Sequence, residues 1–111
     1  MLQKMLQIID TTPILACADC LMLVANGETP EGDYTLPDRI NLRWSVSKET
    51  CDIYGAVHGS LWWDFTLGGE HESEADEYSG SLGFSWSPCQ CCGSSLGGER
   101  YPLTALLWRK P

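Results

Sequence analysis

The stretch Pro88-Cys89-Gln90-Cys91-Cys92-Gly93, near the end of the chain, is the one around which the fold is organised. It has one counterpart near the beginning, Cys17-Ala18-Asp19-Cys20. Zinc prefers four soft ligands in a tetrahedron, and all-cysteine sites are built from two close pairs. A two-residue spacer lets both thiolates of a pair reach one ion, and a following glycine permits backbone conformations that other residues resist. The ligands that we expect for one structural Zn²⁺ are Cys17, Cys20, Cys89 and Cys92.

Other arrangements of the cysteines stay open at this point. The thiols can be free, or they can form disulfides in a secreted protein. Cys91 competes with Cys92, but a Cys89/Cys91 pair has a one-residue spacer and fits less well. His58 is a candidate to replace one cysteine as the fourth ligand, and Cys51 is expected to be an ordinary small core residue. Four thiolates would close the zinc shell and leave no position for water, which marks a structural site.

Length and composition describe a single small domain spanning residues 1–111. Hydrophobic residues make up 43% of the chain and five are tryptophans, as expected of a globular protein. Fifteen acidic residues against seven basic ones give a formal net charge of -8. Sequence-independent nucleic-acid binding depends on Lys and Arg at phosphates, so this charge argues against it. It favours solubility and basic partners instead.

Nothing in the sequence indicates membrane insertion or secretion. The longest apolar run, residues 14–25, is interrupted by Asp19 and is too short to span a bilayer. The first ten residues contain glutamines where a signal peptide has an unbroken apolar region. We therefore expect a cytoplasmic location, where cysteines are metal ligands or free thiols before they are disulfides.

The N-terminal half predicts two or three helices. Apolar residues at helical spacing suggest a short helix over residues 1–9. Thr12-Pro13 can start a second, buried helix over residues 14–25, which would stop at Asn26-Gly27. A third helix is expected from Pro37 to about residue 46.

From Cys51 onwards the pattern favours β-structure. Residues 61–67 alternate between apolar and polar positions, and residues 78–87 and 101–108 also predict strands. The first two would pair as a hairpin across a charged loop. The expected fold is therefore α+β: two to three N-terminal helices packed on a small antiparallel sheet. The four-cysteine zinc site would join the second helix to the end of the second strand.

The strongest charge feature is Glu70-His71-Glu72-Ser73-Glu74-Ala75-Asp76-Glu77. It is either a solvated loop or an acidic surface that occupies a basic, nucleic-acid-binding groove on another protein, because carboxylates can stand in for phosphates opposite Arg and Lys. Exposed aromatics beside such a loop suit an interface. The partner-binding residues that we expect are Glu70, Glu72, Glu74, Asp76, Glu77 and Trp62. Further acids that would extend this surface are Glu28, Glu31, Asp33 and Asp38.

Trp62 and Trp63 lie on opposite faces of their strand, so one is exposed or covered by a helix. A tryptophan lying across its own sheet is the alternative to an interface residue. Catalysis is not expected, because neither histidine lies in a nucleophile or metalloprotease motif. The glycines between Gly93 and Gly98 lack the lysine of a phosphate-binding loop. An EF-hand is excluded by the spacing of the acids.

Two blocks of the chain resemble a known group. Ala16-Cys17-Ala18-Asp19-Cys20-Leu21-Met22-Leu23-Val24-Ala25-Asn26-Gly27-Glu28, together with Phe84-Ser85-Trp86-Ser87-Pro88-Cys89-Gln90-Cys91-Cys92-Gly93-Ser94-Ser95-Leu96-Gly97-Gly98-Glu99-Arg100, resembles small, mostly uncharacterised proteins of bacteriophages and prophages. Tyr101 stands where that group often has histidine. The resemblance covers about a quarter of the chain. It implies a phage origin and joint metal binding by both blocks, and it brings no activity.

These features predict a phage-encoded interaction protein that binds and blocks a protein of its bacterial host. Its most concrete form is an inhibitor of a nucleic-acid-targeting defence complex, in the manner of anti-CRISPR proteins. The alternative is an accessory protein that binds nucleic acid or the host transcription machinery through its zinc knuckle, with Arg100, Arg109 and Lys110 nearby.

Overall fold

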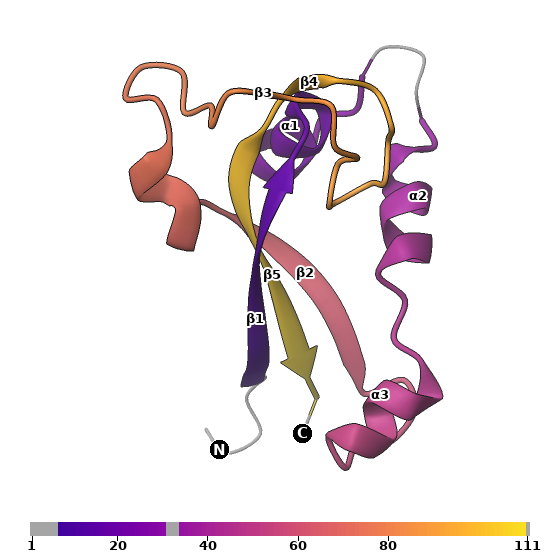
Figure 1. Ribbon diagram of the computed structural model, residues 1–111. Coiled ribbons are helices and arrows are strands. Elements are labelled where there is room, and N and C mark those ends of the chain that lie inside the picture. Colours follow the sequence, from indigo (N-terminus) through magenta and orange to yellow (C-terminus); the bar gives the residue numbers. More distant parts are fainter. Residues whose placement is uncertain (1–6, 31–33, 111) are drawn as a thin grey trace.

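A computed structural model describes residues 7–30 and 34–110 of the chain. A three-stranded antiparallel sheet lies at its centre, in the order β1-β5-β2 (Figure 1). The described elements, in chain order, are β1 (Gln7–Ala16), α1 (Ala18–Asn26), α2 (Leu36–Arg43), α3 (Lys48–Ile53), β2 (Leu61–Leu67), the 3₁₀ helix η2 (Glu70–Glu74), β3 (Phe84–Ser85), β4 (Gly98–Glu99) and β5 (Tyr101–Arg109). The expected α+β class, with helices on an antiparallel sheet and a cluster of four cysteines, is confirmed.

The core lies on one face of this sheet. Leu103, Ala105 and Leu107 alternate along the central strand β5 and are buried. Leu103 packs in one cluster with Ile40 of α2, and Leu107 packs in a second cluster with Cys51 of α3. Trp62 on β2 belongs to the opposite face, where its ring stacks on that of Trp108 at 6.3 Å between centroids. Trp62 is therefore a half-buried residue lying across its own sheet.

The prediction of a helix over residues 1–9 is wrong for the part of that segment that the structure describes. Residues 7–9 belong to β1, and the rest of that prediction lies outside the described residues. The segment Ile8-Ile9-Asp10-Thr11-Thr12 is rich in β-branched side chains, which favour a pleated strand. Pro13 is tolerated because β1 is an edge strand and pairs with β5 alone.

The second helix is present, but it starts later than expected. It begins at Ala18 with Cys17 as its N-cap, whereas Thr12-Pro13 lie inside β1. Its end is as expected. Gly27 adopts a left-handed conformation with φ 72° and donates its N–H to the carbonyl of Leu23 at 2.8 Å. Asn26-Gly27 is therefore a correct stop signal.

The third predicted helix is two shorter ones. α2 ends at Arg43, and α3 begins at Lys48 after Ser47, whose side chain accepts a hydrogen bond from the amide of Thr50. The β-structure expected from Cys51 onwards is also wrong at its start, because Cys51 lies in α3, and residues 54–60 are turns and irregular chain rather than a strand. The N-cap Ser47 fixes the start of the short helix α3.

Strands 61–67 and 101–108 are confirmed, but the predicted hairpin is wrong. β2 pairs with β5, and only Phe84–Ser85 of the segment 78–87 is a strand, paired with β4. Gly80 and Gly83 have φ of 74° and 102°, which no regular strand allows. In the part of the chain that the structure describes, no helix is long and apolar enough to cross a membrane.

Candidate metal centre

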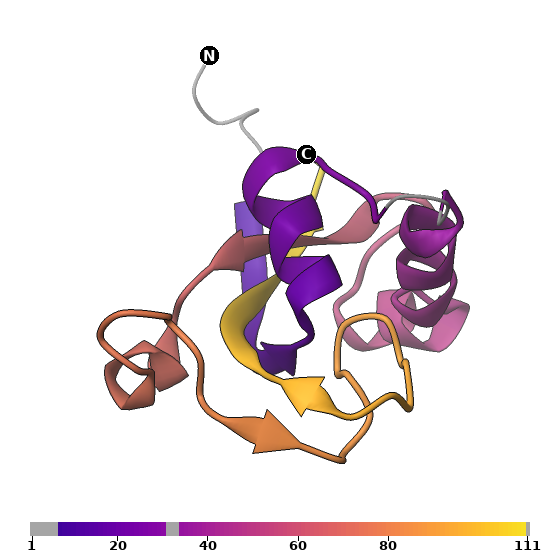
Figure 2. The ribbon, with the colours of Figure 1, turned by 90° about the horizontal axis from the view of Figure 1, so that it is seen from above.

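The two cysteine pairs converge at one end of the sheet. Cys17 caps α1 and Cys20 lies in its first turn, while Cys89 and Cys92 lie in the loop between β3 and β4. Both views place this loop between α1 and α2 (Figures 1 and 2). The four Sγ atoms all lie within 4.8 Å of one another. This cluster has the size and the donor set of a metal-ion site.

Individual distances agree with a tetrahedral ion. The Sγ atoms of Cys17 and Cys92 are 3.9 Å apart, and those of Cys20 and Cys89 are 3.8 Å apart. Four sulfurs each about 2.3 Å from a zinc ion, at tetrahedral corners, lie about 3.8 Å from one another. The thiol donors therefore fit Zn²⁺ without a large rearrangement of the backbone.

The second pair sits in a tight knuckle. Gly93 donates its N–H to the carbonyl of Cys89 at 2.8 Å and has φ 79°, so glycine is required by the turn as expected. Gln90 attaches the knuckle to β1: its N–H donates to the carbonyl of Leu15 at 3.1 Å, and its side-chain oxygen accepts the N–H of Leu15 at 2.6 Å. The end of β1 thus aligns the two cysteine pairs.

Backbone amides surround the sulfur of Cys89. It accepts N–H groups from Cys17 at 3.2 Å, Cys91 at 3.4 Å and Cys92 at 3.5 Å. Hydrogen bonds from the side chains of Cys17 and Cys20, together with these amides, hold the pKa of Cys89 far below its usual range. The pKa of Cys20 is raised by hydrogen bonding with the side chains of Cys17, Cys89 and Cys91 and by burial. The backbone amides thus favour the thiolate form at Cys89.

The cluster is nearly closed to solvent. Cys20 and Cys89 are fully buried and Cys92 is 8% exposed, while Cys17 is half-buried. Trp44 covers the knuckle by donating its Nε1–H to the carbonyl of Cys91 at 2.8 Å. Four thiolates would fill the tetrahedral shell of one ion and leave no coordination position for a water or a substrate, which is the form of a structural site.

The other candidate ligands are placed differently. Cys91 is fully buried beside the cluster, but the group of four that can share one ion contains Cys92. His58 is exposed and is not part of that group. Cys51 is 2% exposed in a separate core cluster with Leu61 and Leu107, which suits a small core residue. All six cysteines are free thiols, so the structure contains no disulfide.

The expected partner-binding acids are exposed, but not all are free to contact a partner. Glu70, Glu72, Glu74, Asp76 and Glu77 lie on η2 and the turn after it, at the edge of the molecule (Figure 1). Asp76 accepts the amides of Tyr78 and Ser79 at 2.8 and 2.9 Å, so its carboxylate shapes a turn. Glu74 contacts the ring of His71 at 3.3 Å.

Trp62 and the further acids do not gather with this acidic segment. Trp62 lies at the start of β2, whereas the segment follows its end, about 17 Å or more along the strand. Asp38 lies on α2, on the opposite side of the molecule from η2 in both views (Figures 1 and 2). Glu28 follows α1, and Glu31 and Asp33 lie outside the described residues.

An exposed aromatic pair was not anticipated from the sequence. Phe84 and Trp86 are 58% and 78% exposed, and their rings meet edge to face at 4.8 Å. Both lie against the backbone of Gly97, where an added Cβ would be 2.5 Å from the Trp86 ring. Neighbouring Leu96 is 78% exposed. The signal in the sequence was the glycine-rich context of residues 79–83, which argues against a long buried strand for these aromatics.

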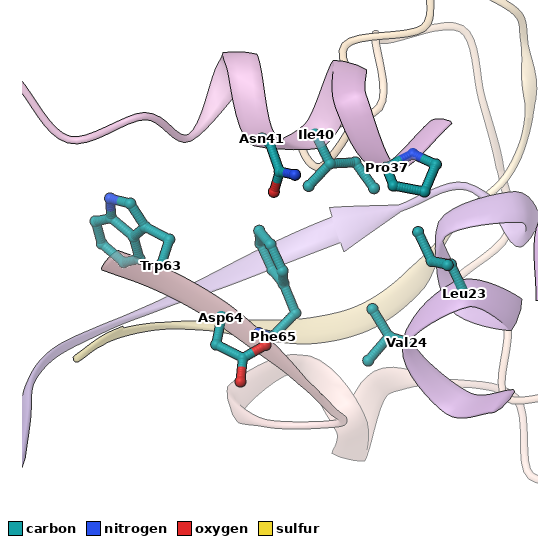
Figure 3. Close-up of a pocket in the computed structure, with 8 residues that line it drawn as sticks. All are labelled: Leu23, Val24, Pro37, Ile40, Asn41, Trp63, Asp64 and Phe65. Atoms are coloured by element: carbon teal, nitrogen blue, oxygen red, sulfur yellow. Dashed lines mark hydrogen bonds between the residues drawn. The ribbon is translucent and has the colours of Figure 1, made fainter. Parts of the chain in front are cut away.

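A groove of about 260 Å³ opens between α1, α2 and β2 (Figure 3). Six of its eight lining residues are apolar, and the ring of Phe65 is directed toward α2. Asp64 is the one ionisable residue among the described residues that line it. The groove is therefore a mostly uncharged surface between the helices and the sheet.

Comparisons of this chain with known protein families, with curated proteins and with solved structures gave no match.

Proposed function

We propose that the four-cysteine cluster binds one structural Zn²⁺, and that the folded chain is a phage-encoded protein that binds and blocks a host protein. The observation that carries the metal assignment is the convergence of four Sγ atoms within 4.8 Å in a buried position. Thiolate sulfur favours soft metals such as zinc, copper(I) and iron over magnesium and calcium, and a closed tetrahedral set of four cysteines is the form of structural zinc sites.

The acidic segment, residues 70–77, is the surface that we assign to the host protein. It presents five exposed carboxylates, and no lysine or arginine within the described ranges forms an ion pair with any of them. The chain is also acidic as a whole, with a formal net charge of -8. Such a surface fits a basic groove that normally holds nucleic acid. An inhibitor of a bacterial defence complex, acting in the manner of anti-CRISPR proteins in the host cytoplasm, is the most concrete form of this function.

The exposed pair Phe84 and Trp86 adds an apolar anchor to this surface. Both follow the acidic segment along the chain, and β3 continues from that segment in both views (Figures 1 and 2). Interfaces draw most of their affinity from a few aromatic anchors surrounded by polar groups. The proposed role is therefore binding, not catalysis.

Direct nucleic-acid binding through the knuckle is the second candidate, and the positions of its basic residues weigh against it. Arg100 is 3% exposed and its guanidinium donates to backbone carbonyls, so it is not available to a phosphate. Arg109 and Lys110 lie at the other end of β5, about 30 Å from Arg100 along the strand. Lys110 lies over the ring of Trp62.

A metal analysis tests the first part of the proposal. Protein purified under reducing conditions should contain one zinc per chain, with no disulfide. Protein that is free of stoichiometric zinc and still folded after chelation would overturn the metal assignment.

Charge reversal tests the second part. The triple variant Glu70→Lys, Glu72→Lys and Glu74→Lys should lose the host protein that the wild type retains from a bacterial lysate, as identified by mass spectrometry. The matched control is Glu49→Lys with Asp52→Lys, which reverses two exposed acids on α3. The zinc content of both variants should equal that of the wild type. Full retention of the host protein by the triple variant, or tight binding of wild type to DNA or RNA at moderate salt, would contradict the proposal.

A further inference from the structure

Arg100 is the one charged side chain that the structure buries among the residues it describes. It is 3% exposed, and the guanidinium group cannot lose its charge in a protein. Arginine is almost never fully buried unless its charge is paired, because removing the ion from water is costly. Its position therefore needs a physical explanation.

The contacts of Arg100 connect the two ends of the cysteine knuckle. Nη2 donates to the carbonyl of Ser87 at 2.6 Å and to that of Leu96 at 3.1 Å, and Nη1 donates to the carbonyl of Glu99 at 3.2 Å. Ser87 precedes Cys89 by two residues, and Leu96 follows Cys92 by four. One planar guanidinium thus holds together the chain segments that enter and leave the loop of the second cysteine pair.

Among the residues that the structure describes, no carboxylate pairs with the charge of Arg100. All three acceptors are neutral carbonyl oxygens, and Nε makes no hydrogen bond. Asp19 and Glu99 line the same cavity of about 200 Å³ as Arg100, but neither forms an ion pair with it in the described structure. Cys17 lines this cavity too, so Arg100 and one of the four clustered cysteines border the same pocket.

A four-thiolate metal centre would supply the missing negative charge. Four thiolates on a divalent ion carry a net charge of about -2, and such a centre is tuned by the groups around its ligands. We propose that Arg100 is a positioning residue of the metal centre: its hydrogen bonds fix the loop that presents Cys89 and Cys92, and its charge offsets the excess negative charge of the thiolates. This inference rests on the metal binding proposed above.

Titration with Co²⁺, followed by competition with Zn²⁺, tests the role of Arg100 in reduced protein at one fixed pH. Co²⁺ bound by four thiolates in a tetrahedron has intense visible d–d and sulfur-to-metal absorption bands, which report geometry and affinity separately. Arg100→Gln keeps hydrogen-bond donors but removes the charge, and Arg100→Lys keeps the charge but loses the planar fork. The matched control is Arg43→Gln, because the exposed Arg43 also donates to this loop, from Nε to the carbonyl of Gln90 at 3.2 Å.

We expect Arg100→Gln to weaken metal affinity by about 10- to 100-fold, the range typical of groups that orient metal ligands. Arg100→Lys should fall between Arg100→Gln and wild type with unchanged tetrahedral bands, and Arg43→Gln should match wild type. Equal affinity of Arg100→Gln and wild type would overturn the inference while leaving the metal site intact. So would equal losses in both Arg100 variants, or an Arg100→Gln protein that stays unfolded at saturating Zn²⁺. Failure of the wild type to bind either metal would instead overturn the proposed metal site itself.

Discussion

The sulfur atoms of Cys20 and Cys89 lie 3.8 Å apart, although 69 residues separate them in the chain. An ion bound between them would close a long loop of the chain, which contains α2, α3, β2, η2 and β3. Structural zinc contributes about 10–16 kcal/mol of apparent binding free energy in small peptides. Whole domains have stabilities of about 5–15 kcal/mol. The metal contribution is therefore of the same size as the entire free energy of unfolding.

Metal removal should accordingly unfold most of the chain. Treatment with a strong chelator under reducing conditions is expected to abolish the cooperative thermal transition measured by circular dichroism, and added Zn²⁺ should restore it. The variant Cys20→Ala should behave like the chelated protein even in excess zinc. A cooperative transition that persists after chelation would show that the sheet and its core suffice for folding.

The cysteines outside the group of four should be dispensable for metal binding. Cys51→Ala and Cys91→Ala each remove one buried sulfur, at a cost of about 1 kcal/mol in the free energy of unfolding. Both variants should retain one zinc per chain, whereas Cys92→Ala should lose it. Elemental analysis of the three purified variants makes this comparison. If Cys91→Ala lost its zinc and Cys92→Ala retained it, Cys91 and not Cys92 would be the fourth ligand.

Trp44 connects three parts of the fold, so its replacement should be costly. Its Nε1–H reaches the carbonyl of Cys91, and its ring meets those of Trp63 and Phe65 edge to face at 5.1 and 5.2 Å. Trp44→Phe removes the donor and part of the ring contact, for a loss of roughly 1–3 kcal/mol in denaturant unfolding. The control Trp86→Phe changes a mostly exposed ring and should stay within about 0.5 kcal/mol of wild type. Similar losses in both variants would contradict this account.

The cysteine cluster was readable from the sequence because its information is local. Each pair carries its own spacing, and Gly93 marks the turn of the knuckle, so the two halves can be recognised separately. The strands 61–67 and 101–108 were readable for the same reason, since each alternates or runs apolar over its full length. The stop at Asn26-Gly27 also depends on one residue with a left-handed conformation.

Strand pairing was not readable, because it is decided by contacts distant in sequence. β1 and β2 both pair with β5, which lies near the end of the chain, and nothing in residues 61–87 alone excludes the hairpin that we expected. β1 was missed because the apolar residues at the start of the chain have helical spacing and Thr12-Pro13 has the form of a helix start. The break between strand and helix falls at Cys17, where a ligand position requires the chain to turn.

The contribution of the Asp76 carboxylate to the stability of its turn should depend on pH. Hydrogen bonds from the backbone at Ser79 and Tyr78 lower the pKa of this carboxyl below its ordinary value of 3.8. Because the folded-state pKa is depressed, the contribution to stability is present above the unfolded-state pKa and is lost as the pH falls through the folded-state pKa. Carboxyl-resolved NMR should place the midpoint below 3.8. Asp76→Ala should speed amide exchange at Tyr78 and Ser79, and an unshifted midpoint with unchanged exchange would contradict the turn assignment.

The exposed ring of Trp86 should matter to the host protein far more than to the fold. It is 78% exposed and held against Phe84 and Gly97, so Trp86→Ala removes a preformed aromatic anchor without opening the core. We expect affinity for the captured host protein to fall by about tenfold or more, as for an interface hot spot. Tyr78→Ala is the matched control, because Tyr78 is 96% exposed and makes no ring contact in the described structure. It should bind within about twofold of wild type, since an isolated exposed ring contributes little. Calorimetry measures the affinity of each variant for the host protein. Equal affinities for Trp86→Ala and wild type would show that the aromatic pair is not part of the binding surface, and that the acidic segment acts alone.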